Sequence, residues 1–306
     1  MLRSMLEKYG GFNLRSRIFP RPRVANALQF DQIVDTGVLD CYEPQKPFLS
    51  RTSPIVTIGS CFARNVALQL LDAGYNVYTA PVTDLLFTPP ALLRFTEALR
   101  DSVPATQMRE YWDINQTDAD RMRTLIAEGA TVIVTFGLST VWIDKKTGGM
   151  IPDPSSKSVN EHNKGIRTLP DPARYEMRQM GVEAIVEALQ GIIKAIREIG
   201  TNNKIVLTLS PIPLALSAND QPVFVADCIS KSSLRVALDE VMRHRIEDIY
   251  YFPSFELLRW FATMVTGIWY EDKLLSHIRH EWIRYTVSKF RQYYCTEPHV
   301  ALPPFP

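Results

Sequence analysis

Residues 53 to 65 read Ser-Pro-Ile-Val-Thr-Ile-Gly-Ser-Cys-Phe-Ala-Arg-Asn, an apolar run that stops at a glycine and continues into a helical pattern. The β-branched residues before Gly59 fit a buried strand, and Gly59 permits a sharp turn. From Phe62 onward, apolar residues recur at four-residue spacing, as they do along one face of a helix. The pattern predicts a strand, a tight turn and a helix, with Ser60 and Cys61 at the bend.

This bend holds two side chains that can attack an acyl group. A thiol at a helix N-terminus faces unpaired N–H groups and the positive end of the helix dipole, and both favour the thiolate. Cys61 is therefore the first candidate nucleophile and Ser60 the second. The alternative for Cys61 is a structural role, because buried cysteines pack as small apolar residues.

Composition sets the class of protein. The chain has 306 residues, of which 46% are hydrophobic and 22% charged, and its formal net charge is +1. This length fits one large α/β domain or two average domains, and the apolar runs are too short for a membrane span. A charge so close to zero gives no reason to expect nucleic acid or an anionic membrane as a partner.

The N-terminal residues and the cysteines indicate a compartment. Residues 1–9 lack the apolar core of a signal peptide. The cysteines, at positions 41, 61, 228 and 295, are widely scattered and show no metal-type spacing. We therefore expect a cytoplasmic protein with reduced thiols and no metal site.

The order of patterns along the chain predicts an α/β domain preceded by an irregular arm. Residues 1–50 are interrupted by glycines and prolines, so we expect an arm that wraps the domain or contacts a second subunit in a homo-oligomer. From Ser53 onward, strand and helix patterns alternate, as in a parallel sheet covered by helices. The predicted strands are 53–59, 76–80, 131–137, 204–211 and 249–252, and the predicted helices are 89–99, 172–199, 230–244 and 279–294.

Two stretches between these elements are expected to be loops. Residues 138–142 continue from the third predicted strand, and residues 144–170 form a long polar connection. A loop of that length inside a compact domain is commonly functional.

Several motifs resemble one known family in chain order. Gly59-Ser60-Cys61-Phe62-Ala63 is the motif from which the GSCFA family takes its name. The resemblance continues with Thr135-Phe136-Gly137, Leu209-Ser210-Pro211, Ser230-Lys231 followed by Leu234, and residues 251–256. It spans roughly residues 51 to 295, most of the chain.

The resemblance implies a fold. The GSCFA family is similar to a branch of the SGNH (GDSL-like) hydrolase superfamily, which has a three-layer α/β/α sandwich around a mainly parallel, flavodoxin-like sheet. Its site lies at the carboxyl ends of the strands, where open α/β sheets bind ligands. The expected organisation is an irregular arm over 1–50, the SGNH-like domain over 51–296 and a C-terminal tail over 297–306.

The resemblance also implies site residues. The superfamily carries its serine after the first strand in a Gly-Asp-Ser motif, and Cys61 holds the matching position. The histidine base near the C-terminus matches His277, with His280 in reserve. The family's aspartate lies three or four residues before its histidine, whereas Asp272 lies five before His277, so Asp272 and Glu271 are both candidates for the orienting acid.

The remaining candidates bind the oxyanion or the substrate. Backbone N–H groups at Ser60 or Cys61 are expected to hold the oxyanion, with Ser139 as the best side-chain donor. Satisfying a nearby turn is the alternative role for the Ser139 hydroxyl. The residues matched to family motifs or lying beside them complete the set: Gly59, Gly137, Asn160, His162, Ser210 and Lys231.

In this interpretation Cys61 attacks an ester or thioester, and His277 accepts the thiol proton and returns it to the leaving group. The expected function is that of an O-acyl ester hydrolase or O-acyltransferase acting on a small molecule or glycan, with a carbohydrate hydroxyl as the favoured acceptor. No cofactor is required, and acyl-CoA is a compatible donor. The alternative is a non-catalytic glycan-binding or scaffold protein with the same fold.

Overall fold

The computed structural model describes residues 27–80, 86–151, 153–154, 170–263, 278–297 and 299. Its centre is a five-stranded sheet in the order β2-β1-β3-β7-β8, with every neighbouring pair parallel. The strands are β1 (Ile55–Gly59), β2 (Val77–Thr79), β3 (Thr131–Phe136), β7 (Ile205–Leu209) and β8 (Ile249–Phe252). All five strands that the sequence predicted are confirmed.

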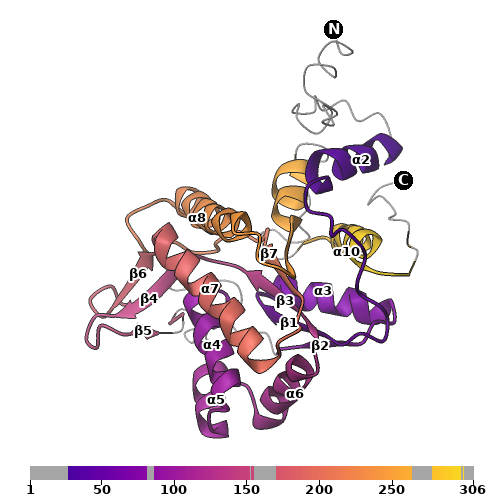
Figure 1. Cartoon of the computed structure of the whole chain (residues 1–306). Helices are drawn as coiled ribbons and strands as arrows, with labels where there is room; N and C mark the ends of the chain where they lie inside the picture. The colour runs from indigo at the N-terminus through magenta and orange to yellow at the C-terminus, as the bar shows by residue number, and fades with distance from the viewer. Residues whose placement is uncertain are drawn as a thin grey trace.

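Helices cover both faces of this sheet. One face packs against α2 (Ala27–Val34), α3 (Cys61–Asp72), the π-helical η5 (Glu256–Ala262) and α10 (His280–Tyr294). The other packs against α4 (Pro89–Asp101), α5 (Ala105–Trp112), α6 (Gln116–Ala127), α7 (Val182–Ile199) and α8 (Val223–Arg243). Figure 1 shows α3 and α10 on the opposite side of the sheet from α4 and α7. The predicted three-layer α/β/α fold is confirmed.

Alternating strand residues build the two cores. In β1, Val56 and Ile58 belong to the core beneath α4 and α7, whereas Ile55 belongs to the core beneath α3 and α10. In β3, Val134 and Ile133 divide in the same way. Successive side chains of a strand point to opposite faces, so a parallel sheet covered on both sides needs apolar residues at nearly every position.

The strand order locates the switch point of the sheet. The chain runs from β1 outward to β2, returns past β1 to β3, and then continues in the other direction through β7 and β8. In doubly wound sheets, ligands bind outside the carboxyl ends of the strands where this direction reverses. Here that place lies between the ends of β1 and β3, where Gly59 pairs with Thr135.

A second, antiparallel sheet projects from one side of the domain (Figure 1). It contains β5 (Met150–Ile151), β4 (Thr140–Asp144) and β6 (Tyr175–Gln179) in that order. The loop predicted over 138–142 is wrong from Thr140 onward, where β4 begins. The helix predicted to begin at 172 begins only at Val182, and β6 precedes it. The apolar stripe that identifies α7 begins only at Ile185, and pairing with β4 determines the conformation before it.

The start of α8 also differs from the prediction. Ser230 was expected to open a helix, but α8 begins at Val223, after Pro222, and Ser230 and Lys231 lie buried in its middle. A serine resembles an N-cap in sequence because its hydroxyl can satisfy a terminal N–H group. Here the Ser230 hydroxyl accepts instead from the backbone N–H of Ser139, at 2.9 Å.

Part of the predicted irregular arm is helical and packed. Residues 27–39 form α2 and the π-helical turn η2 (Asp35–Leu39), and Phe30 and Val34 are fully buried in the core that contains α10. Leu49 pairs with Cys295 in an isolated parallel bridge. The expectation of irregular structure is thus wrong for 27–39 and untested for 1–26, which lie outside the described residues. Contact of the arm with a second subunit stays a prediction.

A buried lysine attaches this N-terminal segment to α10. Lys289 is fully buried, and its Nζ lies 2.7 Å from a carboxylate oxygen of Asp31 and 2.6 Å from one of Asp35. The Tyr285 hydroxyl donates to the same Asp31 carboxylate at 2.8 Å. A charge removed from water in this way needs its partners, because uncompensated burial is costly.

We expect Lys289→Ala to lower the free energy of unfolding by about 3 kcal/mol, because it leaves two neighbouring carboxylates without their cation. Lys204→Ala is the matched control. Lys204 is one-third exposed and pairs with Asp248 at 2.6 Å, so its loss should cost less than about 1 kcal/mol. Urea unfolding followed by circular dichroism measures both. Equal losses would show that the buried Lys289 pairs stabilise the protein no more than the partly exposed Lys204–Asp248 pair does.

Within the described part of the chain, each helix is too short or too polar to traverse a bilayer.

Candidate active site

The turn after β1 has a backbone that suits glycine. Gly59 has φ +127°, and a Cβ added there would lie 2.1 Å from the Thr135 carbonyl oxygen. The next residue, Ser60, donates its backbone N–H to that same oxygen at 3.2 Å. The absence of a side chain at Gly59 therefore lets β1 and β3 approach closely where the chain turns into α3.

Ser60 and Cys61 differ in accessibility. Ser60 is the N-cap residue of α3 and only 3% exposed, and its hydroxyl has no hydrogen-bond partner among the described residues. Cys61 is the first residue of α3 and is half-buried. The first N–H groups of a helix have no intrahelical acceptor, so the thiol lies at a site that favours negative charge. Exposure and position both favour Cys61 over Ser60 as the group that meets a substrate.

The end of β3 lies against this turn. A Cβ on Gly137 would lie 3.5 Å from the Ser60 Cβ, which brings these two predicted residues together. The backbone N–H groups of Gly137 and Leu138 both donate to the Phe87 carbonyl oxygen, at 2.8 and 3.0 Å. The amides of Ser60, Gly137 and Leu138 thus already have acceptors, and the predicted oxyanion donor at Cys61 stays a prediction.

Ser139 is occupied by structural hydrogen bonds. It is fully buried, and its hydroxyl donates to the Ser230 carbonyl oxygen at 3.0 Å and accepts from Gln179 Nε2 at 2.6 Å. These bonds connect the segment after β3 to α8 and β6. They support the alternative role of Ser139, a hydroxyl that satisfies its local structure.

Lys231 and Ser210 meet at the ends of β3 and β7. Lys231 is 2% exposed, and its Nζ donates to the carbonyl oxygens of Gly137 at 2.6 Å and of Ser210 at 2.8 Å. Burial lowers the pKa of Lys231 to about 7, since desolvation disfavours the ammonium. The structure therefore places the Lys231 amine beside the switch point, together with Gly137 and Ser210.

An ion pair between the buried Asp227 and the partly buried Arg259, on which the sequence analysis is silent, lies near Lys231. Asp227 is 3% exposed, accepts from the Leu214 backbone N–H at 2.7 Å and pairs with Arg259. Arg259 also donates to the Pro211 carbonyl oxygen at 3.1 Å, which fixes the chain as it leaves β7. Asp227 and Lys231 are four residues apart on α8, so they lie on the same helix face. The predicted helix start at Ser230 left Asp227 outside the helix, so this four-residue spacing was not noticed.

Five predicted site residues lie outside the described residues: Asn160, His162, Glu271, Asp272 and His277. Their roles stay predictions. The reserve base His280 is described: its Nε2 lies 3.0 Å from the Gln69 side chain. Gln69 is about 12 Å along α3 from Cys61, at about 1.5 Å per residue. The His280 ring therefore lies beside the far half of α3, away from the bend.

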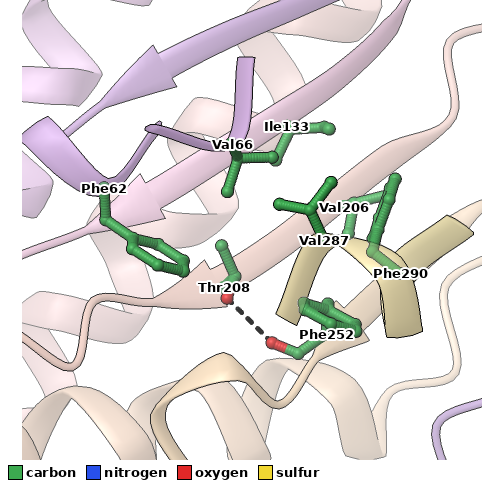
Figure 2. Close-up of a pocket in the computed structure, with 8 residues that line it drawn as sticks. All are labelled: Phe62, Val66, Ile133, Val206, Thr208, Phe252, Val287 and Phe290. Carbon is green, nitrogen blue, oxygen red and sulfur yellow. Dashed lines mark hydrogen bonds between the residues drawn. The ribbon is translucent and has the colours of Figure 1, made fainter. Parts of the chain in front are cut away.

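The apolar cavity between the sheet and α3 is a packing void. Figure 2 shows Phe62 and Val66 of α3 facing Thr208, Phe252 and α10 across this cavity. Its volume is about 10 Å³, about enough for one water molecule. A substrate does not fit there, and the candidate site at the strand ends is argued from the switch point between β1 and β3. Among the described residues, no group of three or more His, Cys, Asp or Glu side chains is gathered for a metal ion.

Comparisons with known proteins give a family match and a similar solved structure. A family model described as the GSCFA family matches residues 54–290. A comparison with curated proteins gives no match. A solved structure described as "a putative GDSL-like lipase" from Parabacteroides merdae ATCC 43184 is similar, with a TM-score of 0.39 and 14% sequence identity. That alignment covers 80% of this chain and 97% of the other.

Proposed function

Because this chain belongs to the GSCFA family, we propose that its signature turn is the reactive centre of an SGNH-type acyl-transfer enzyme. The observation that carries the proposal is the position of Cys61. It is half-buried at the N-terminus of α3, directly after the strand that borders the switch point. In doubly wound sheets this is where a substrate lies, and helix N-termini favour the thiolate. Ser60 is the second candidate nucleophile.

The proposed reaction has two steps. In the first, the Cys61 sulfur attacks the carbonyl carbon of an ester or thioester, and the leaving group departs with a proton, which leaves a thioester on the enzyme. In the second, water or a sugar hydroxyl attacks that thioester and the thiol is restored. His277 is the base that the family resemblance implies for both proton transfers. Water as acceptor makes the protein a hydrolase, and a sugar hydroxyl makes it an O-acyltransferase.

We favour the O-acyltransferase, with a carbohydrate hydroxyl as acceptor and an acyl-thioester such as acetyl-CoA as donor. Transfer between a donor thioester and Cys61 exchanges one thioester for another, so that step is close to balanced in energy. The carbohydrate acceptor rests on the family resemblance, and the cytoplasmic location is the expectation drawn from the scattered cysteines.

The test is thiol release from acetyl-CoA, measured with and without a panel of mono- and oligosaccharides. We expect release that the acceptor accelerates and that is lost in Cys61→Ala. Cleavage of a simple aryl ester with no turnover of any thioester would instead identify a hydrolase. Absence of both reactions, in a folded protein whose Cys61 is intact, would overturn the proposal.

A non-catalytic glycan-binding protein is the second candidate. It is favoured by one observation: the amides of Ser60, Gly137 and Leu138 all have intramolecular acceptors, so an oxyanion has few backbone donors there. On this alternative, Cys61→Ala leaves glycan affinity unchanged, which isothermal titration calorimetry measures.

A further inference from the structure

The Ser60 hydroxyl is a buried polar group that the reaction above does not use when Cys61 is the nucleophile. Ser60 directly precedes Cys61 in the signature turn and is 3% exposed. Its Oγ has no hydrogen-bond partner among the described residues. A buried hydroxyl without a partner costs free energy, so a native structure that keeps one calls for an explanation.

Capping α3 is not the explanation. An N-cap serine usually accepts a hydrogen bond from the second or third N–H group of its helix. Ser60 has the extended backbone of an N-cap residue, with φ −67° and ψ 171°, but its side chain makes no such bond. The first N–H groups of this 12-residue helix carry the positive end of its dipole. The unused hydroxyl and the helix end therefore favour the same ligand, an oxygen atom that carries negative charge.

The Ser60 side chain lies at the switch point of the sheet. Its Cβ is 3.5 Å from the position that a Cβ on Gly137 would take, and Gly137 directly follows β3. The side chain is therefore between the ends of β1 and β3. Serine has a single side-chain torsion between heavy atoms, and no hydrogen bond to a described residue fixes it here. The hydroxyl can thus turn toward an acyl oxygen beside Cys61.

Other donors at this place are already in use. The backbone N–H groups of Ser60, Gly137 and Leu138 each donate to a carbonyl oxygen of the protein. The Ser139 hydroxyl, which the sequence favoured as the side-chain donor, also donates to a carbonyl oxygen. An oxyanion that forms beside Cys61 therefore needs a donor that the fold does not occupy, and the Ser60 hydroxyl meets that requirement.

We propose that the Ser60 hydroxyl is a catalytic hydrogen-bond donor, which holds the carbonyl oxygen of the acyl group while Cys61 attacks it. The inference rests on the proposed function. As the C–S bond forms, an electron pair of the C=O bond moves to the oxygen, and the hydroxyl donates a hydrogen bond to the resulting oxyanion. The pair returns when the bond to the leaving oxygen or sulfur breaks. Ser60 keeps its own proton throughout, so the proton transfers stay with His277. A donor that is shielded from water is well suited to this role.

The first test measures turnover of acetyl-CoA or p-nitrophenyl acetate, whichever the wild type accepts, by Ser60→Ala. We expect kcat to fall about a hundredfold and KM to change less than about threefold, because the hydrogen bond forms in the transition state. Thr57→Val is the matched control. Thr57 lies in β1, is fully buried, and its hydroxyl also has no partner among the described residues. Its loss should leave kcat within about twofold of the wild type.

The second test separates the proposed contact from a structural role. Alkylation of Cys61 by iodoacetamide forms no oxyanion, so Ser60→Ala should leave its rate at pH 7 within about twofold of the wild type. Cys41→Ser and Cys228→Ser remove the two exposed thiols from both proteins. Cys295 is buried, and burial raises its pKa to about 11, so it stays unreactive near neutral pH. Alkylation that falls in parallel with kcat would show that Ser60 acts through the thiol or the turn, and would overturn the inference.

The outcomes for turnover distinguish this inference from the proposed function. Turnover that requires Cys61 but is equal in the wild type and Ser60→Ala would overturn this inference alone. Turnover that survives Cys61→Ala and disappears in Ser60→Ala would make Ser60 the nucleophile, and would overturn its role as a donor. If the folded wild type turns over neither substrate, the proposed function fails and this inference fails with it.

Discussion

Cys61→Ala is expected to lower kcat/KM for acyl transfer at least about a thousandfold, because the group that forms the acyl-enzyme is gone. The substitution keeps the helix: alanine is the best helix former, and Cys61 is the first residue of α3. The free energy of unfolding should therefore change little. Thiol release from acetyl-CoA and urea unfolding, measured on the same preparation, check the two statements together.

Cys228→Ala is the matched control for that experiment. Cys228 is exposed on α8, so its removal should leave turnover within about twofold of the wild type. If Cys61→Ala retains its activity, Ser60→Ala becomes the decisive variant, since the Ser60 hydroxyl lies at the same turn. Retention of activity in both variants would exclude the signature turn as the source of the nucleophile.

Gly59→Ala should lower the free energy of unfolding by at least about 4 kcal/mol, or prevent folding. Two causes add. The φ of +127° is unfavourable for any residue with a Cβ, and the new Cβ would lie 2.1 Å from the Thr135 carbonyl oxygen. Relief requires β1 and β3 to separate at the switch point, because the obstacle is backbone. Urea unfolding, or the soluble yield if the variant does not fold, measures the effect.

Gly129→Ala isolates the first cause, the positive φ. Gly129 also has a positive φ, of +88°, but a Cβ there meets nothing within 4 Å. Its cost should stay at about 1–2 kcal/mol, the penalty of the left-handed backbone alone. If the two variants lose the same stability, contact between the turn and β3 is not what requires glycine at position 59.

The central sheet was predictable from sequence for a physical reason. A parallel strand buried on both faces has a continuous apolar sequence. Strands β1, β3 and β7 each have such a sequence, which ends at a glycine or at a Ser-Pro pair. The turn residues Ser60 and Cys61 were predictable with them, since only these positions lie between a strand that stops at Gly59 and the helical pattern that follows. The long helix α7 followed from its stripe, which begins at Ile185.

The elements that failed depend on tertiary contacts. Strand β6, at residues 175–179, has no stripe of its own and takes its conformation from pairing with β4. Helix α2 is short, and its buried residues Phe30 and Val34 stabilise it only by packing against η5 and α10. The start of α8 was misplaced because Ser230 has the chemistry of a cap and a different partner.

The sequence predicted several residues of the candidate site, but it did not predict their burial or their contacts with one another. Family motifs named Gly137, Ser210 and Lys231, and the structure joins all three through two hydrogen bonds of one amine. No local pattern states that Lys231 is buried, because burial depends on the depth of α8 in the fold. The ion pair of Asp227 with Arg259 joins α8 to η5, and sequence separation hides such pairs.

The ionic attachment of α2 to α10 affects where the chain can be cut. The stretch matched by the family model begins at residue 54. It leaves out Asp31 and Asp35, which neutralise Lys289, and the apolar side chains of α2 that pack in the core with α10. A fragment trimmed to the family boundaries would expose the core around α10 to water and leave the Lys289 ammonium without its two carboxylates. We therefore expect the smallest fragment that folds on its own to begin upstream of the family match, and expression clones should begin upstream of Ala27.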